Sequence, residues 1–228
     1  DVNFGALARN MVNYLEQQDG FDLLLSHSVE EMSQYSNGDW RVDLKNGHTG
    51  KTENIRTKFL FFGAGGGALP LLQMSGIPEG DGYGGFPVSG QWLVCKKPEI
   101  VEQHMAKVYG QAPIGAPPMS VPHLDSRVID GKRALLFGPF AGFTTKFLKE
   151  GSALDMPLSM RLSNLKPIMQ VGAKNMDLTR YLISEVMQSH GDRVDSLRRF
   201  FPDAKNEDWE LSYAGQRVQI IKKSEEGE

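Results

Sequence analysis

The sequence predicts an α+β fold, and three features of its 228 residues support this prediction. Apolar and polar residues alternate over short stretches of the first third, which is the period of half-buried antiparallel strands. Glycine and proline separate the strand candidates, and apolar residues recur at helical spacing within 155–200. Apolar residues make up 40% of the chain, enough for a substantial core. We therefore expect an antiparallel meander with one central strand, followed by a mixed sheet with helices.

The beginning of the chain predicts a helix and a strand. Apolar side chains at three-and-four spacing over 4–18 are typical of an amphipathic helix. Asn3 precedes this segment and is a suitable N-cap, because its side-chain oxygen can accept from a backbone N–H of the first turn. The apolar segment 21–34 follows and predicts a strand.

A hairpin and a buried strand are expected next. Alternating residues from Trp40 to Leu44 predict a half-buried strand, and Asn46-Gly47 is a strong turn signal. The run Phe59 to Phe62 is apolar throughout, so we expect it to form the central, buried strand of the first part of the chain.

Residues 63–68 form a glycine loop before a short predicted helix. Gly63, Gly65 and Ala68 satisfy the pattern G-x-G-x-x-A, which taken alone is a dinucleotide fingerprint. The expected second parallel strand does not follow, because 78–91 reads as a glycine- and proline-rich connector. Two readings stay open: a plain turn, and a loop whose backbone a flavin or pyrophosphate can approach closely.

We place a domain boundary after residue 85, inside this connector. The second part is predicted to contain, in order, a strand at 88–96, a helix at 98–110, a hairpin around Asp130-Gly131 with strands near 119–128 and 133–139, helices within 155–200, and a strand at 210–222.

Composition excludes several classes of function. The formal charge is −3 and the pI about 6.0, so no basic field attracts nucleic acid. Cys95 is the single cysteine, so neither an internal disulfide nor a zinc site with paired thiols is expected. No apolar run reaches the ~20 residues of a membrane span, and no histidine pair suggests a metal site. We expect a protein that binds neither metal nor nucleic acid.

The candidate site residues lie in the predicted hairpin "VPHLDSRVIDGKRALLFGPFAGF". His123, Asp125 and Arg127 are two residues apart, so they share one face of a strand. A lone histidine is more often structural, but an arginine on the same face offers a planar fork that binds a carboxylate. Arg217 lies in a strand-like segment near the chain end, where it is either an edge charge or a second anion-binding fork.

Several longer stretches resemble one family, the malate:quinone oxidoreductases. These are "DVNFGAL", "FLFFGAGGGALPLLQMSGIPE", "GFPVSGQWLVC", the hairpin above and "NEDWELSYAGQRVQIIKK", and together they extend over essentially the whole chain. The family consists of flavoproteins that oxidise malate to oxaloacetate and pass electrons to membrane quinone. The missing initiator Met suggests an internal fragment, and the resemblance places the family's amino-terminal flavin fingerprint and carboxyl-terminal segment outside it.

The resemblance implies FAD as cofactor, malate and quinone as partners, and a cytoplasmic location, peripheral to the inner face of the cell membrane. It also implies a partial FAD-binding domain at 1–85 and a substrate-binding domain at 86–228, as in FAD-linked 2-hydroxyacid oxidases. The residue roles it implies are His123 as catalytic base, Arg127, Arg217 and Gln216 as substrate-binding residues, and Val29, Gly63, Ala64 and Gly65 as cofactor-binding residues.

These roles suit the chemistry of a 2-hydroxy acid. A base must take the hydroxyl proton while hydride leaves the same carbon, and histidine, with an ordinary pKa of ~6.5, accepts protons near neutrality. Malate carries two carboxylates, and each needs a cation in a water-poor site. For Asp125 two readings stay open: it orients His123, or it pairs at the surface or in a turn.

Three other functions remain as alternatives. An FAD-dependent oxidase of another 2-hydroxy dicarboxylate would use the same two arginines. A nicotinamide dehydrogenase would need an acidic partner downstream of the glycine loop, but Glu79 and Asp81 both lie in the connector. A non-catalytic binding module is compatible with composition alone.

Overall fold

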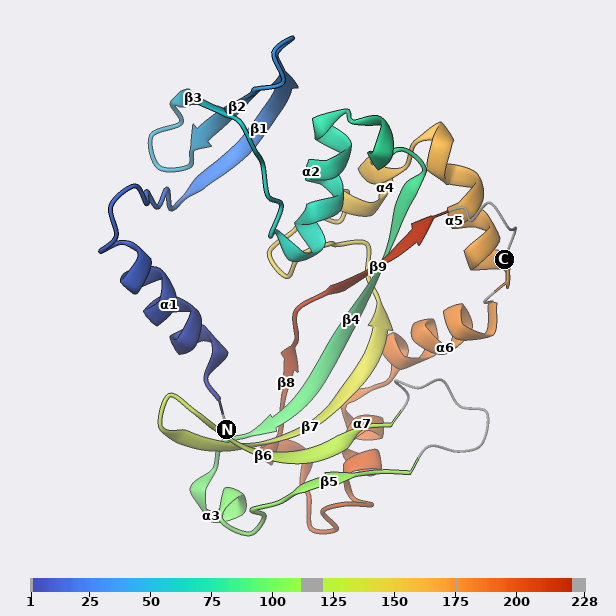
Figure 1. Cartoon of the computed structure of the whole chain (residues 1–228). Helices are drawn as coiled ribbons and strands as arrows, with labels where there is room; N and C mark the ends of the chain where they lie inside the picture. Colours follow the sequence, from blue (N-terminus) through green and yellow to red (C-terminus); the bar gives the residue numbers. More distant parts are fainter. Residues whose placement is uncertain (1, 112–120, 175, 223–228) are drawn as a thin grey trace. The chain divides into compact units, whose positions relative to one another are not determined.

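The computed structural model in Figure 1 describes residues 2–111, 121–174 and 176–222. The chain divides into two compact units. The first contains Asp1–Ala64 and Pro70–Asp81, and the second contains Gly65–Leu69 and Gly82–Glu228. Helices and antiparallel sheets make up the described chain, which confirms the predicted α+β class.

The first unit begins with α1 (Phe4–Leu15), and the predicted cap is confirmed. The side-chain oxygen of Asn3 accepts from the backbone N–H of Ala6 at 3.0 Å. The helix buries none of its residues, although its sequence is amphipathic; Phe4 is 74% exposed. In the first unit, therefore, α1 contributes little to a core.

A three-stranded antiparallel sheet forms the centre of the first unit. Its strands are β1 (His27–Gln34), β2 (Trp40–Asn46) and β3 (Thr52–Thr57), in that order. The hairpin between β2 and β3 is confirmed at the predicted turn, where the Asn46 side chain accepts from the N–H groups of His48 and Thr49. Met32, Val42 and Leu44 make the small core.

Two strand predictions in this unit are wrong. Strand β1 begins at His27 and not at residue 21, and Leu25, just before it, is 71% exposed. Residues 59–62 form no strand: Phe59 and Phe61 are 76% and 85% exposed, whereas Leu60 and Phe62 pack against the small core. A run of apolar residues does not reveal which of its side chains have a partner to pack against.

The predicted glycine loop and short helix are confirmed as η1 (Gly65–Gly67) and α2 (Ala68–Ser75). A further turn of 3-10 helix, η2 (Pro78–Gly80), ends the first unit's part of the sequence.

The connector predicted at 78–91 is the largest error. Residues 83–91 of it belong to a 13-residue strand, β4 (Tyr83–Cys95), which lies at the centre of the second unit. The strand predicted at 88–96 is confirmed as the second half of β4. Gly84 and Gly85 of β4 are needed because other side chains pack closely against the strand there, and not because the chain turns. A Cβ on Gly84 would lie 2.8 Å from Ile168 Cγ1, and one on Gly85 would lie 2.7 Å from Val218 Cγ1.

Strand β4 lies within a six-stranded sheet whose path is β5-β6-β7-β4-β8, with β9 also paired to β4. The remaining strands are β5 (Lys107–Tyr109), β6 (His123–Ile129), β7 (Lys132–Phe143), β8 (Glu210–Tyr213) and β9 (Arg217–Lys222). Every pairing in the described part of the chain is antiparallel, so the predicted mixed sheet is wrong.

The hairpin of β6 and β7 is confirmed, with Asp130 and Gly131 at positive φ of 50° and 76°. The helix predicted at 98–110 is only α3 (Pro98–Val101), because Lys107–Tyr109 pairs with β6 as an edge strand. The final predicted strand is two strands, β8 and β9, which pair with different parts of β4.

The helices predicted within 155–200 are confirmed as α4 (Asp155–Ser159), α5 (Leu162–Lys174), α6 (Met176–Met187) and α7 (His190–Leu197). Val194 and Leu197 of α7 pack with sheet residues such as Leu93 and Phe137 in the main core. Cys95 belongs to this core, is fully buried, and has a thiol whose pKa is raised by burial.

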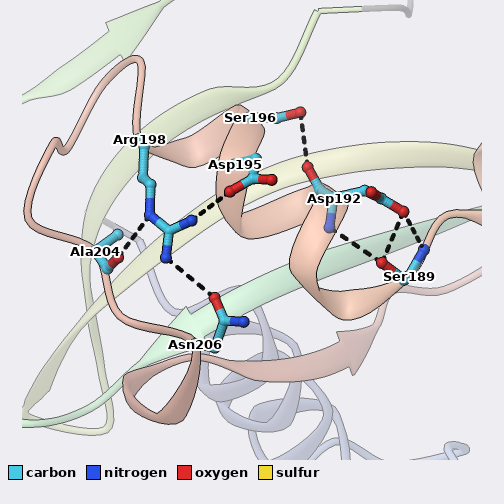
Figure 2. Close-up of polar contacts among 7 residues, drawn as sticks. All are labelled: Ser189, Asp192, Asp195, Ser196, Arg198, Ala204 and Asn206. Atoms are coloured by element: carbon cyan, nitrogen blue, oxygen red, sulfur yellow. Dashed lines mark hydrogen bonds and ion pairs between the residues drawn. The ribbon is translucent and has the colours of Figure 1, made fainter.

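Both ends of α7 are fixed by side chains, as Figure 2 shows. Ser189 and Asp192 form a capping box at its start, with the Ser189 hydroxyl accepting from the Asp192 N–H. After its end, Arg198 donates to the Ala204 carbonyl at 3.0 Å and to Asn206 Oδ1 at 3.2 Å. These contacts hold the segment that leads through η3 (Asn206–Asp208) into β8.

Candidate functional site

His123 is the first residue of β6, and its ring lies between two aromatic rings. Tyr109 of β5 stacks on it at a centroid distance of 4.8 Å, and the Trp92 ring of β4 meets it edge-on at 5.2 Å. The Nε2 atom is buried and has no hydrogen-bond partner among the described residues. The two rings thus fix the position of the imidazole, and its Nε2 can still form a hydrogen bond.

Strand alternation places His123 on the sheet face opposite the main core. Leu124, the next residue, is fully buried with Leu135 and Phe137 of β7, on the face that α7 covers. His123, Asp125 and Arg127 therefore lie together on the other face, as the sequence predicts. We call this face the histidine face, and it also carries Trp92.

Two cations and one carboxylate form a cluster beside His123. The side chain of Asp125 is only 5% exposed; its Oδ2 accepts from Arg127 Nε at 2.5 Å and lies 3.2 Å from Lys107 Nζ. Burial raises the pKa of Asp125, but the hydrogen bonds from Arg127 and Lys107 outweigh it, so the pKa lies below its ordinary value. Of the two readings of Asp125, the structure supports pairing with cations.

The same surroundings keep His123 neutral. Burial lowers the pKa of His123 below its ordinary value, and the positive charge of Lys107 lowers it further. Asp125 acts in the opposite direction, and Arg127 adds to the lowering. A neutral imidazole is the form that accepts a proton.

Arg127 has hydrogen-bond donors that its ion pair with Asp125 does not use. Only its Nε is engaged with Asp125, and no contact of its terminal nitrogens with another hydrogen-bonding group occurs among the described residues. Its guanidinium carbon lies 5.5 Å from the centre of the Trp92 ring, which also contacts His123. Both terminal nitrogens are therefore available near His123 for an anion.

Arg217 lies on the same sheet but at a distance. It pairs with Val88 of β4, four residues before Trp92, and Arg127 pairs with Ala134 at the other end of the hairpin. At about 3.3 Å per residue, Arg217 is roughly 13 Å from the level of His123 along the strands, on the side opposite Arg127. Arg127 is likewise four residues from His123, but its guanidinium lies beside the Trp92 ring that contacts His123. Among the described residues no such shared contact links the exposed Arg217 to His123. Gln216 lines a cavity to which neither arginine nor His123 contributes.

The predicted cofactor-binding residues are divided between the units. Val29 in β1, Gly63 and Ala64 belong to the first unit, and Gly65 belongs to the second. Gly65 has a φ of +54°, and nothing lies within 4 Å of where its Cβ would stand, so a ligand can approach this backbone. By contrast, a Cβ on Gly66 would lie 2.0 Å from the Phe147 carbonyl oxygen, so this glycine is required by packing.

Sequence reasoning missed three members of the cluster: Trp92, Lys107 and Tyr109. Trp92 reads as a core anchor, and the other two fall in the segment predicted as helix. The alternation of Lys107 and Tyr109 was the available signal, since residues two apart share a strand face. In the described ranges, no group of three potential ligands could hold a metal ion, and no helix is long and apolar enough to cross a membrane.

The family model and the similar proteins all point to one family. The model of the malate:quinone oxidoreductase (Mqo) family matches residues 1–228. A probable malate:quinone oxidoreductase of Hahella chejuensis is 65% identical over 227 residues, which are 100% of this chain and 46% of that protein. A second, from Pseudomonas aeruginosa, is 60% identical over 98% of this chain and 44% of that protein.

A third relative, the probable malate:quinone oxidoreductase of Flavobacterium johnsoniae, is 57% identical over 100% of this chain and 46% of its own length. The chain thus spans a little under half the length of these relatives. Among solved structures, the flavin-dependent monooxygenase PieE in complex with FAD and substrate aligns with 86% of this chain and 26% of its own, at 12% identity. Its TM-score of 0.31 is too low to support a structural argument.

Proposed function

Because the chain belongs to the malate:quinone oxidoreductase family, we propose that it forms part of an enzyme that oxidises malate to oxaloacetate and delivers the electrons to quinone. Residues 86–228, which make up most of the second unit, are the substrate-binding part in this proposal. The observation that best supports it is His123: a neutral imidazole with an unpartnered ring nitrogen, held between Tyr109 and the Trp92 ring that Arg127 also contacts.

His123 would act as the base. In its neutral form it takes the proton of the malate hydroxyl, which prepares the carbon that carries this hydroxyl for loss of hydride. Lys107 and Arg127 keep the imidazole neutral before the reaction, because a positive charge nearby disfavours a second one. Tyr109 and Trp92 fix the plane of the ring, so that little ordering remains to be done when substrate arrives.

The two arginines would bind the two carboxylates from opposite sides of His123. Arg127 presents terminal N–H groups beside Trp92, and Asp125 holds its Nε side in place. Arg217 lies towards the other end of the sheet, and its long side chain would contact the second carboxylate. Burying a carboxylate without such a partner costs several kcal/mol.

FAD is the cofactor we propose, arranged as in FAD-linked 2-hydroxyacid oxidases. When bound, it supplies the hydride acceptor. Val29, Gly63, Ala64 and Gly65 would hold it, and the open backbone at Gly65 fits a close approach by such a ligand. In this arrangement residues 1–85 are part of the FAD-binding domain, and 86–228 form the substrate-binding domain.

We also propose that the enzyme works at the cytoplasmic face of the cell membrane, as a peripheral protein. The support for this location is chemical: quinones that accept electrons in the cell are dissolved in the lipid, so the acceptor must be reached there.

The test is a comparison of two substitutions in an intact enzyme of the relatives' length that contains this chain. His123→Gln should lower kcat by roughly 10²–10⁴-fold and change the KM for malate little. Arg127→Ala should mainly raise the KM for malate, by about tenfold to a hundredfold, because a hydrogen-bonded charge contact is lost. The matched control is His48→Gln, since His48 is exposed in the β2–β3 turn. Equal, small effects of His123→Gln and Arg127→Ala would refute these roles.

The cofactor is tested by the visible absorption spectrum of the same purified enzyme. A flavin spectrum supports FAD, and a colourless enzyme that neither gains absorbance nor becomes active with added FAD contradicts it.

A further inference from the structure

The second unit has a further cavity on the sheet face opposite His123, towards α6. It has a volume of about 400 Å³ and is lined by residues of β4, the end of β7 and the loop after it, α6, the end of β8 and the segment between β8 and β9. Its position follows from strand alternation: Gln91 lines this cavity, whereas Trp92, the next residue of β4, contacts His123. The volume is within the usual range of small-molecule sites.

Two amide side chains in this cavity have unpaired carbonyl oxygens. Gln91 is 9% exposed, and neither its Oε1 nor that of Gln216 has a hydrogen-bond partner among the described residues. Both atoms are shielded from solvent, and leaving a buried acceptor without a donor costs about 1–3 kcal/mol. Both side chains line the cavity, so rotation of their amides would offer two hydrogen-bonding groups to a ligand with two polar ends.

The remaining lining is partly apolar and partly polar, with two lysines, one glutamate (Glu150) and the hydroxyl groups of Ser89 and Thr144. Phe143, Val186 and Tyr213 contribute carbon surface, and Lys146 and Lys149 contribute positive charge. A flat ring fits such walls, and the lysines favour any negative charge that develops on the ring.

We propose that this cavity binds the ring of the quinone acceptor, an inference that rests on the proposed function. A quinone has two carbonyl groups that need donors, and its reduced form has two hydroxyl groups that need acceptors. A glutamine amide serves both forms, because rotation by about 180° exchanges its NH₂ group for its oxygen. Malate fits less well, because it has no ring to pack against the carbon surface of Phe143, Val186 and Tyr213.

The proposal assigns Gln216 to the quinone and leaves Arg217 to malate. It also places the two sites back to back across β4, separated by the thickness of one sheet. The malate site and the quinone site would then both use residues of β4, but on opposite faces of the sheet.

The first test is photolabelling of the unmodified intact enzyme with an azido derivative of a short-chain quinone. We expect label on the peptide that contains Gln91 or on residues 213–216, and loss of that label when unmodified quinone is added in excess. Specific label found only elsewhere would overturn the proposal. This test needs no variant and does not depend on turnover.

The second test uses substitutions. Gln91→Leu and Gln216→Leu should each raise the KM for the short-chain quinone about tenfold, the size of one lost hydrogen bond, and leave the KM for malate within about twofold. Gln219→Leu is the control, because Gln219 is exposed on β9. An unchanged KM for quinone in both variants, or a rise in the KM for malate instead, would overturn the assignment.

A dye that accepts electrons from the enzyme without using the quinone site separates the two proposals. Malate-dependent dye reduction should remain in both glutamine variants. If the unmodified enzyme oxidises no malate even with the dye, the proposed function fails, and the photolabelling result still decides whether the cavity binds quinone.

Discussion

The two faces of the central sheet in the second unit are built for different tasks. On the covered face, Leu93, Leu124, Leu135 and Phe137 are completely buried and pack with α7. On the histidine face, one step along each strand, lie Trp92, His123, Asp125 and Arg127, which are joined by ring contacts and ion pairs. Consecutive residues of β6 thus belong alternately to the core and to the candidate site.

This difference indicates that substitutions within one strand can change either the stability of the fold or the properties of the candidate site, depending on the face they lie on. A side chain on the covered face contributes through lost water contact and close packing. A side chain on the histidine face contributes charge and hydrogen bonds, even where it is as buried as Asp125. Substitutions at neighbouring positions should therefore have distinct signatures, and the following experiments test whether they do.

The largest effect on stability is expected from Leu124→Ala. Removing a fully buried leucine leaves a cavity in the main core, so the free energy of unfolding should fall by about 2–5 kcal/mol. Urea unfolding of the chain, followed by circular dichroism, measures this. Leu158→Ala is the control, since Leu158 is 77% exposed. A loss under about 1 kcal/mol for Leu124→Ala would contradict the distinction between the faces.

A smaller effect is expected from Asp125→Asn. The amide keeps the size of the carboxylate but removes its charge, which weakens the bonds from Arg127 and Lys107. The free energy of unfolding should fall by roughly 1–2 kcal/mol, and the KM for malate in the intact enzyme should rise because Arg127 loses its support. Asp177→Asn, in an exposed pair on α6, should change neither. Loss of stability without any rise in KM would mean that Asp125 serves the fold alone.

Ser189→Ala should cost about 1 kcal/mol of stability, since it removes the capping box of α7 shown in Figure 2. The residue is remote from His123 in sequence and belongs to the covered side. The KM and kcat for malate should therefore stay the same at a temperature well below the melting point. Altered kinetics in this variant would show that the two faces are coupled.

The smallest effect concerns pH. The folded-state pKa of His123 lies below its unfolded value, so the unfolded chain binds a proton first as the pH falls. The contribution of His123 to stability is complete above about pH 6.5 and decreases below it, towards the folded pKa. As the pH falls below about 6.5, His123→Gln should therefore lose less stability than the unmodified chain. Equal pH dependence of the two, in paired urea titrations, would show that His123 is not buried as described.

The sequence predicts the elements that depend on local signals and fails where distant packing decides. The turns at Asn46-Gly47 and Asp130-Gly131 and the Asn3 cap need only neighbours along the chain, and all three are confirmed. The strand predicted at 88–96 is confirmed as the second half of β4, but the first half was taken for a connector. Gly84 and Gly85 lie there because a side chain would clash with Ile168 and Val218, which are distant in the sequence. Nothing in the local pattern distinguishes such a glycine from one in a turn.

The candidate site shows the same limit. Strand alternation predicts that His123, Asp125 and Arg127 share a face, and the structure places them so. That Asp125 pairs with Lys107 could not be predicted, since it depends on β5 being a strand and on its register with β6. The separation of Arg217 from Arg127 likewise depends on which part of β4 each neighbour pairs with.

Cys95 is an intrinsic probe of local unfolding at the end of β4. Its thiol is fully buried at the end of β4, and burial raises its pKa, so a thiol reagent in water meets almost no thiolate on the folded chain. Labelling must wait until the end of β4 separates from its neighbours. The rate of labelling in native buffer therefore reports how often this part of the sheet opens, with no probe added and no other cysteine to interfere.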